Sequence, residues 1–152
     1  METAQPAVVP VALAGGGSLG VTAAPFIRSG PAAVLDLARR ADRLGYGSLW
    51  VAEVTGIEAF SVLGAVSHAA PGLGLGTGVV PMQVRTPPLL AMAAACVQAL
   101  VPAREVLVGV GVSSPVVAGD WHGTGYPARP LARMREFRPS STDGFSVARL
   151  AQ

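Results

Sequence analysis

Residues 73–80 read LGLGTGVV, an apolar run that contains three glycines and no charged side chain. Similar runs flank it in the sequence, SLWVA at 48–52 and EVLVGVGV at 105–112. None of these runs alternates apolar with polar residues, which is typical of strands buried on both faces of a parallel sheet. Segments with helical character separate the runs, so their order predicts a parallel β-sheet with helices outside it.

The segments between the strands carry recognisable helix signals. We expect helices over residues 29–44, 55–70, 86–100 and, as a short piece, 131–137. Gly45 is placed to end the first helix, because glycine readily adopts the left-handed conformation that follows many helices. Thr55 and Glu58 have the spacing of a capping box, which would open the second helix. Pro87, just after Thr86, suits the first position of the third.

The N-terminal part of the chain gives weaker signals. Residues 7–14, AVVPVALA, predict a short apolar strand, and residues 15–30 predict irregular structure. The run GGGSLG at 15–20 has the GxGxxG pattern. A dinucleotide-binding fingerprint needs a helix directly after its last glycine, and the residues that follow contain Pro25 and β-branched side chains instead. A flexible loop is therefore the favoured interpretation of this run.

The spacing of the strands predicts the architecture. The runs begin at residues 48, 73 and 105, intervals that fit the repeat of a (β/α)₈ barrel. The 152 residues hold only about four such units. The predicted fold class is therefore α/β, a partial (β/α)₈ TIM barrel with parallel strands. Residues 1–137 are expected to form the N-terminal half of the barrel, and residues 138–152 a divergent C-terminal tail.

Composition excludes several classes of protein. Hydrophobic residues make up 51% of the chain and charged residues 13%, which argues against a disordered protein. The 11 basic residues are scattered arginines that form no phosphate-tracking stripe, so no nucleic-acid partner is expected. A single cysteine, Cys96, excludes an internal disulfide and a cysteine metal site. Cys96 is expected to be a buried, inert thiol, and no metal is expected.

Two long stretches without formal charge, 59–84 and 86–103, raise the question of a membrane. Prolines and glycines interrupt both, whereas a spanning helix needs about 20 continuous apolar residues. No arginine precedes Arg28, so the basic start of a signal peptide is missing. We therefore expect a cytoplasmic protein without a membrane partner; a small membrane-associated protein is the minor alternative.

Several stretches in order and spacing resemble one family over residues 44–137. They are LGYGSLWVAE (44–53), LGTGVVP (75–81), RTPPLLAMAAACVQAL (85–100), VLVGVGVSSPVV (106–117) and RPLARMREF (129–137). Together they resemble the luciferase-like monooxygenase superfamily, and within it the deazaflavin (coenzyme F420)-dependent oxidoreductases. The resemblance implies a barrel whose cofactor lies at the C-terminal ends of the strands, where barrel enzymes build their sites.

The resemblance also implies particular cofactor-binding residues. In this family a non-prolyl cis peptide at the end of the third strand supports the ring of the cofactor, and Gly78-Val79 matches that position. Gly111, Ser113 and Ser114 close and follow the fourth strand. Their backbone and hydroxyl groups would hydrogen-bond coenzyme F420 or, alternatively, FMN.

The candidate catalytic residue is Glu53, which follows a buried strand. Many relatives have an acid and then a histidine there, whereas this chain has Val54 after the acid. Trp121 and His122 lie in the loop after the fourth strand and are candidate substrate-loop residues. His68 is expected to be an ordinary helical histidine. Arg85 follows the third strand and is expected to be a solvated loop arginine rather than a phosphate ligand.

The function implied by the resemblance is hydride transfer between F420, or FMN, and a small organic substrate, or else monooxygenation. The alternative is a truncated, catalytically inactive barrel fragment or a flavin-binding protein that depends on assembly. Four strands leave two sheet edges, and unpaired edges recruit other chains. The sequence therefore also predicts a homo-oligomer or self-association.

Overall fold

The computed structural model describes residues 19–137. Four strands alternate with helices along this part of the chain. The elements are β1 (Gly20–Thr22), η1 (Ala24–Ser29), α1 (Gly30–Arg43), β2 (Ser48–Val51), α2 (Ala59–Ala69), β3 (Gly74–Pro81), α3 (Pro87–Leu100), β4 (Val106–Gly111), η2 (Val116–Trp121) and α4 (Pro130–Glu136).

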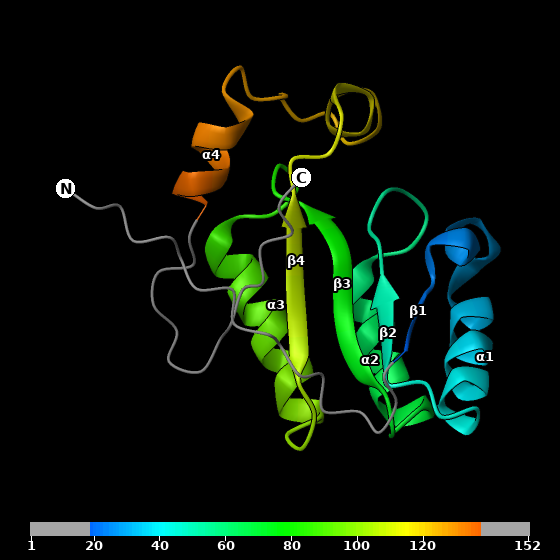
Figure 1. The fold of residues 1–152 in the computed structure, drawn as a ribbon. Coiled ribbons are helices and arrows are strands. Elements are labelled where there is room, and N and C mark those ends of the chain that lie inside the picture. The colour runs from blue at the N-terminus through cyan, green and yellow to red at the C-terminus, as the bar shows by residue number, and fades with distance from the viewer. Residues whose placement is uncertain (1–18, 138–152) are drawn as a thin grey trace.

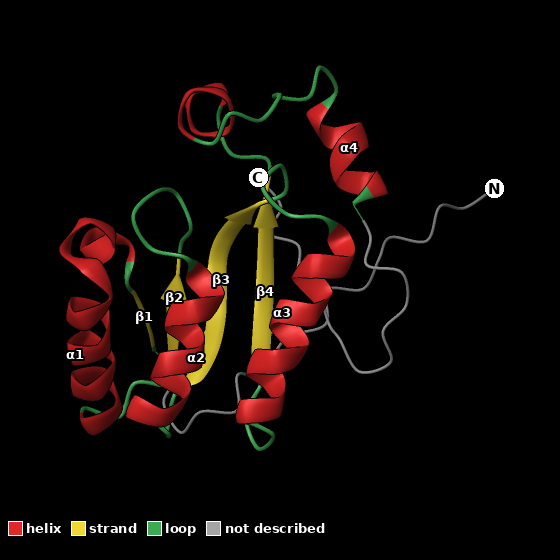
Figure 2. Cartoon of the chain, turned by 180° about the vertical axis from the view of Figure 1, so that it is seen from behind, coloured by secondary structure: helices red, strands yellow, loops and turns green. Residues whose placement is uncertain are grey.

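The strands form one sheet in the order β1-β2-β3-β4, and all three pairings are parallel. Their C-terminal ends therefore point to the same edge of the sheet, and η2 and α4 lie beyond that edge (Figure 1). Helices α1, α2 and α3 all cover the same face (Figure 2). The predicted parallel sheet with neighbouring strands in sequence order is confirmed.

The core lies between the helices and the covered face of the sheet. Leu49 of β2 and Leu75 of β3 are partners in register and are completely buried. Val34 of α1, Leu63 of α2 and Leu90 of α3 are buried in the same apolar cluster. Because successive strand residues point to opposite faces, Leu49 and its neighbours at alternate positions belong to the helix side.

The other face of the sheet is built around Trp50. Its indole Nε1 donates a hydrogen bond to Ser48 Oγ at 3.0 Å. A Cβ atom on Gly76 would lie only 2.6 Å from Trp50 Cε3, and one on Gly20 would lie 3.1 Å from Trp50 Nε1. Glycines at these two positions therefore give the indole its room, which explains the glycine at position 76 of β3.

The helix ends follow the predicted signals with one exception. Gly45 has a φ of +79°, and its amide donates to Asp42 O, so it ends α1 as predicted. Thr86 caps α3 through the Leu89 amide. The predicted opening of the second helix at Thr55 is wrong, because Glu58 itself is the cap and α2 begins at Ala59. Residues 55–57 are instead part of the loop that leaves β2.

The structure tests the expectations for the two ends of the chain only in part. The predicted strand at 7–14 lies outside the described residues, as does the tail at 138–152. The stretch 15–30, expected to be irregular, contains β1 and η1. β1 is only three residues long and is defined by its pairing with β2, which no local pattern reveals. Since Gly20 opens a strand rather than a helix, the run at 15–20 is not a dinucleotide-binding fingerprint.

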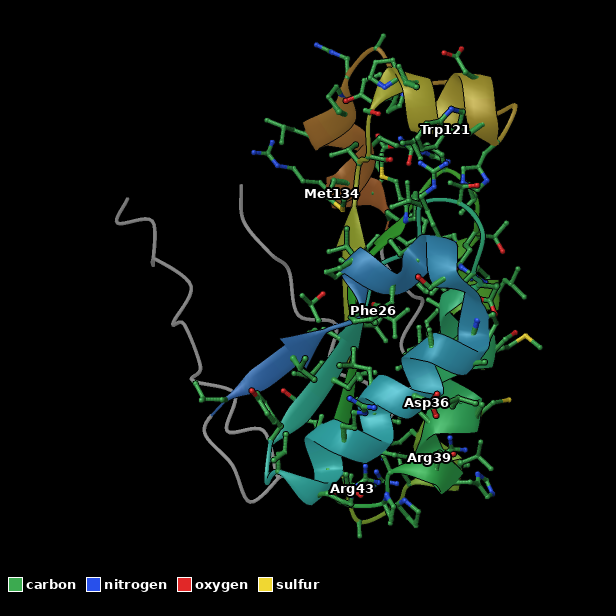
Figure 3. The ribbon with its side chains drawn as sticks, turned by 90° about the vertical axis from the view of Figure 1, so that its right-hand side faces the viewer. Phe26, Asp36, Arg39, Arg43, Trp121 and Met134 are labelled. Carbon is green, nitrogen blue, oxygen red and sulfur yellow. The ribbon has the colours of Figure 1, made fainter. Side chains whose placement is uncertain are left out.

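The outer surfaces of the helices differ in character. Asp36, Arg39 and Arg43 lie along α1 (Figure 3). Helix α3 carries no charged residue and exposes apolar side chains, namely Leu89, Met92 and Leu100. Cys96 is also exposed, so the predicted buried thiol is wrong. The buried residues of α3 are Leu90, Ala94 and Val97, and position 96 falls outside that stripe.

None of the helices in residues 19–137 has both the length and the apolar character needed to cross a lipid bilayer.

Gly109 tests the close packing of β3 against β4. A Cβ atom there would collide with the carbonyl oxygen of Thr77, whose hydroxyl donates to Gly109 O at 2.9 Å. Gly109→Ala is expected to lower the free energy of unfolding by about 2 kcal/mol, a usual cost of overpacking. Gly125→Ala is the control, because a Cβ there meets nothing within 4 Å. Urea denaturation measures both, and equal stability of the two variants would contradict this packing.

Candidate functional site

Backbone hydrogen bonds join the loops at the C-terminal edge of the sheet. The Glu53 amide, just after β2, donates to Val79 O at 3.0 Å. The Met82 amide, just after β3, donates to Gly111 O at 2.9 Å. Three of the predicted site residues, Glu53, Val79 and Gly111, are thus brought into one hydrogen-bonded framework.

The centre of this framework is an irregularity in β3. The peptide bond between Gly78 and Val79 is cis, at the position that the family resemblance implied. The pairing of β3 with β4 shifts register between Thr77 and Val80. We call Gly78 and Val79 the bulge. Gly78 is exposed and Val79 half-buried, so the bulge presents backbone at the surface of the strand ends.

Trp50 and Gly111 flank the bulge. A Cβ atom on Gly78 would lie 3.6 Å from Trp50 Cε3, which is ordinary van der Waals contact. On the other side, a Cβ on Gly111 would lie 2.6 Å from Val79 Cγ2. Gly111 therefore leaves room for the Val79 side chain. Trp50 was not among the predicted site residues, because its strand was read only as a buried apolar run.

Glu53 is held from two sides through one oxygen. Its side chain is only 7% exposed. Its Oε2 accepts a hydrogen bond from the Ala59 amide at 2.9 Å, at the start of α2, and from Arg85 Nη2 at 2.7 Å. The predicted catalytic acid thus links β2 to both α2 and the β3–α3 loop.

Arg85 is not the solvated loop arginine that the sequence predicted. Its side chain is 12% exposed, bonds Glu58 as well as Glu53, and lies over the Phe60 ring at 5.2 Å from the centroid. Burial acts to lower the pKa of Arg85, but the two carboxylates outweigh it and raise the pKa above its ordinary value. A signal was present in the sequence, since Arg85 is the lone charge between residues 59 and 103.

Glu58 joins this cluster from the start of α2. Its carboxylate accepts from the amides of Phe60 at 3.1 Å and Ser61 at 2.7 Å. Partial burial acts to raise the pKa of Glu58, but hydrogen bonds to Ser61 and Phe60 and the charge of Arg85 lower it below its ordinary value.

The two predicted serines take different positions after β4. Both are exposed. Ser113 has a φ of 60°, an uncommon conformation for a residue other than glycine. Ser114 Oγ accepts from the Val117 amide at 3.2 Å and so supports the first turn of η2. The structure therefore leaves Ser113 at the strand ends and gives Ser114 a partner within its own chain.

The predicted substrate-loop residues return toward β2. His122 Nε2 lies 2.6 Å from Val54 O, and the imidazole must donate because a carbonyl oxygen only accepts. Trp121 is 54% exposed and lies beyond the strand ends (Figure 3). The aromatic ring beside Gly78 is that of Trp50 rather than Trp121.

His68 is an exposed residue of α2 whose Nδ1 lies 2.9 Å from Ser67 Oγ, as expected for a helical histidine.

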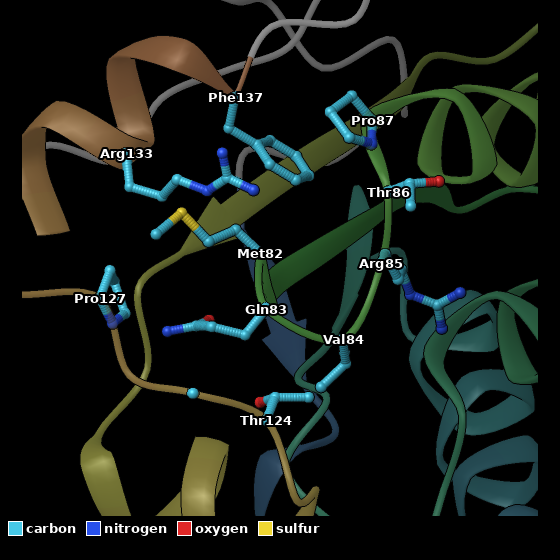
Figure 4. Close-up of a pocket in the computed structure, with 11 residues that line it drawn as sticks. Met82, Gln83, Val84, Arg85, Thr86, Pro87, Thr124, Pro127, Arg133 and Phe137 are labelled. Atoms are coloured by element: carbon cyan, nitrogen blue, oxygen red, sulfur yellow. The ribbon is translucent and has the colours of Figure 1, made fainter.

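A cavity of about 330 Å³ lies between the β3–α3 loop, the loop after η2 and α4 (Figure 4). Phe137, Met82 and Pro127 give it apolar walls, and Arg133 reaches it from α4. Gln83 Nε2 donates to Val112 O, whereas Gln83 Oε1 is buried without a hydrogen-bond partner in the described part of the chain. Arg133 therefore brings a cation to the cavity, whereas Gln83 Oε1 is enclosed by protein and is not open to it.

Comparison with known proteins identifies relatives of this chain. Residues 8–138 match the family model of luciferase-like monooxygenases. A Mycobacterium tuberculosis protein, provisionally named a coenzyme F420-dependent oxidoreductase, is 36% identical over 102 residues. That match covers 67% of this chain and 29% of the relative, so the chain spans less than a third of the relative's length.

Two solved structures share the fold. The coenzyme F420-dependent tetrahydromethanopterin reductase of Methanopyrus kandleri superposes with a TM-score of 0.66 at 18% identity, covering 83% of this chain and 38% of the reductase. The oxygenating constituent of 3,6-diketocamphane monooxygenase from Pseudomonas putida, in complex with FMN, gives 0.60 at 17% identity and covers 69% and 32%. These neighbours are TIM-barrel enzymes, which confirms the predicted partial (β/α)₈ barrel.

Glu58 gives a pH-dependent prediction. Glu58→Ala is expected to lower the free energy of unfolding by about 1 kcal/mol at neutral pH, because the cap of α2 is lost. Since the pKa of Glu58 is lowered on folding, its stabilisation is present above the ordinary pKa and is lost as pH falls through the lowered one.

Urea denaturation of both proteins from pH 7 down to about pH 3 checks this prediction. The difference in stability between wild type and Glu58→Ala should shrink toward acid pH. A difference that does not change with pH would mean that the ionised carboxylate contributes nothing to the cap.

Proposed function

Because the chain belongs to the luciferase-like monooxygenase family, we propose that its strand ends bind a flavin-type ring and serve an oxidoreductase reaction on a small organic substrate. The observation that carries the proposal is the exposed bulge at Gly78 and Val79, with Trp50 at its side. We propose coenzyme F420 as the cofactor, in line with the 36%-identical relative, and FMN as the alternative, in line with the structural neighbour.

The residues present fit a flat ring. Gly78 offers an exposed backbone surface with no side chain of its own. The Val79 side chain lies beside Gly111, so β4 borders the bulge on that side. We call the backbone surface of the bulge the platform. Ser113 adds an exposed hydroxyl at the end of β4. A planar group resting on the bulge would therefore meet backbone and one hydroxyl rather than a crowded side-chain layer.

A bound deazaflavin or flavin supplies the hydride chemistry, while the protein supplies binding and orientation. In this proposal Gly78 and Val79 support the ring, Ser113 and Ser114 contribute polar contacts, and Trp121 and His122 shape the substrate side. Hydride transfer is the proposed reaction, and monooxygenation is the alternative. Glu53, the sequence candidate for proton transfer, is joined to the bulge through its backbone amide, which donates to Val79 O.

The cavity beside the β3–α3 loop is the proposed entrance for substrate. Its volume of about 330 Å³ suits a small organic molecule. Arg133, which lines the cavity, would attract a carbonyl or anionic group of the substrate. We further propose that residues 1–137 form the N-terminal part of the barrel and that residues 138–152 are a divergent tail.

Cofactor titration tests this function. The purified chain should bind F420 or FMN, seen as a change in cofactor fluorescence. Gly78→Val places a branched side chain on the exposed platform and should weaken affinity by roughly tenfold, which corresponds to about 1.4 kcal/mol. Gly64→Val on α2 is the control, because a Cβ there lies 4.0 Å from its nearest neighbour, Leu100 Cδ1. Absence of binding by the wild-type chain would contradict the function, and unchanged affinity of Gly78→Val would remove the bulge from the site.

A second proposal is that the chain self-associates, as an inactive fragment or an assembly-dependent flavin-binding protein would. β1 and β4 are the outer strands of the described sheet, and edge strands pair readily with other chains. Leu89, Met92 and Leu100 of α3 are about half exposed or more, which adds an apolar surface. Light scattering at micromolar concentration is expected to give a mass above that of a monomer, and a sharp monomer mass would contradict it.

A further inference from the structure

Glu53, Arg85 and Glu58 form a charged cluster that joins three separate parts of the chain. Arg85 lies 32 residues from Glu53 and 27 from Glu58 in the sequence, yet its Nη2 contacts a carboxylate oxygen of each. The cluster therefore ties the β3–α3 loop to the loop between β2 and α2. A buried or half-buried ionic group of this kind is costly unless every charge is partnered.

Glu53 connects the cluster to the bulge through its own backbone. Its amide donates to Val79 O at 3.0 Å, while its carboxylate is held by the Ala59 amide and Arg85. The side chain and the main chain of one residue thus hold different elements. A displacement of the Glu53 carboxylate would therefore also displace the Glu53 amide, which is bonded to Val79 O.

The Glu53 side chain points away from the open face of the sheet. Glu53 lies beyond the end of β2 at Val51, so its direction is given by its contacts. These lie on the helix side, since Ala59 opens α2 and Arg85 lies over Phe60 of α2. Figure 4 shows the Arg85 side chain directed away from Gln83 and Thr124 of the cavity. The cluster therefore lies behind the platform rather than on it.

We propose that Glu53 and Arg85 are positioning residues, which clamp the β3–α3 loop to β2 and thereby hold the Val79 side of the bulge in place for the cofactor. The proposal rests on the proposed function for the identity of the ligand, and on the hydrogen bonds alone for the clamp. It assigns Glu53 a role other than proton transfer. It also adds Arg85 to the residues on which cofactor binding depends.

The two roles of Glu53 give opposite results in a binding experiment. If Glu53 transfers a proton, Glu53→Gln should leave cofactor affinity unchanged. If Glu53 positions the bulge, Glu53→Gln and Arg85→Met should each weaken F420 or FMN binding by roughly tenfold, a loss typical of one good contact. The double variant should then bind no more weakly than either single variant, because both remove the same clamp.

An exposed pair of the same chemistry supplies the control. Arg39 Nη1 lies 2.9 Å from Asp36 Oδ1 on the outer side of α1, where the side chains are 48% and 70% exposed. Asp36→Asn and Arg39→Met should leave cofactor affinity unchanged, since exposed pairs contribute little. All titrations use the full chain at a temperature at which urea denaturation shows each variant to be fully folded.

Amide hydrogen exchange tests the clamp without a cofactor. Arg85→Met should raise exchange in residues 50–54 and 78–82, which contain the Glu53 amide and the bulge, and leave α1 unchanged. Unchanged exchange in both segments, or additive losses of affinity in the double variant, would overturn the proposal. If the wild-type chain binds neither cofactor, the proposed function fails, and the exchange result alone decides whether the clamp exists.

Discussion

The described structure depends on β3, which is hydrogen-bonded to β2 along one side and to β4 along the other. Its helix-facing residues, such as Leu75, are in the apolar core, while Gly76 gives room to Trp50 on the opposite face. The pairing is interrupted only near its C-terminal end, between Thr77 and Val80. β3 therefore forms the centre of the sheet, leaves room for the Trp50 ring and presents the exposed backbone of the bulge.

The parallel sheet was predictable because its three longer strands are apolar without alternation, which is typical of strands in a parallel sheet. Helix ends were predictable where one residue decides them, as Gly45 and Thr86 do. β1 was not predictable, because a three-residue strand at Gly20 depends on the β2 edge rather than on its own sequence. Cys96 was misplaced because alanines around it give no sign of which side of α3 faces the core.

The position of the candidate site followed from the rule that barrel strands present their C-terminal ends to ligands. Its side-chain contacts did not follow, because they join residues far apart in the chain. Arg85 meets Glu53 across 32 residues, and His122 meets Val54 across 68. The one available signal was physical: an isolated charge within a long apolar stretch must either reach water or find partners, and Arg85 finds two carboxylates.

The two faces of the sheet carry different groups at its C-terminal edge. The helix side holds the ionic cluster, where Glu53 and Arg85 are largely removed from water. The open side presents Trp50 and, beside it, the exposed Gly78 of the bulge. A platform made of backbone fits the shape of a planar ring but does not distinguish two rings of similar outline. Under the proposed function, selection between F420 and FMN would therefore fall to the side chains around the bulge, among which Ser113 offers an exposed hydroxyl at the end of β4.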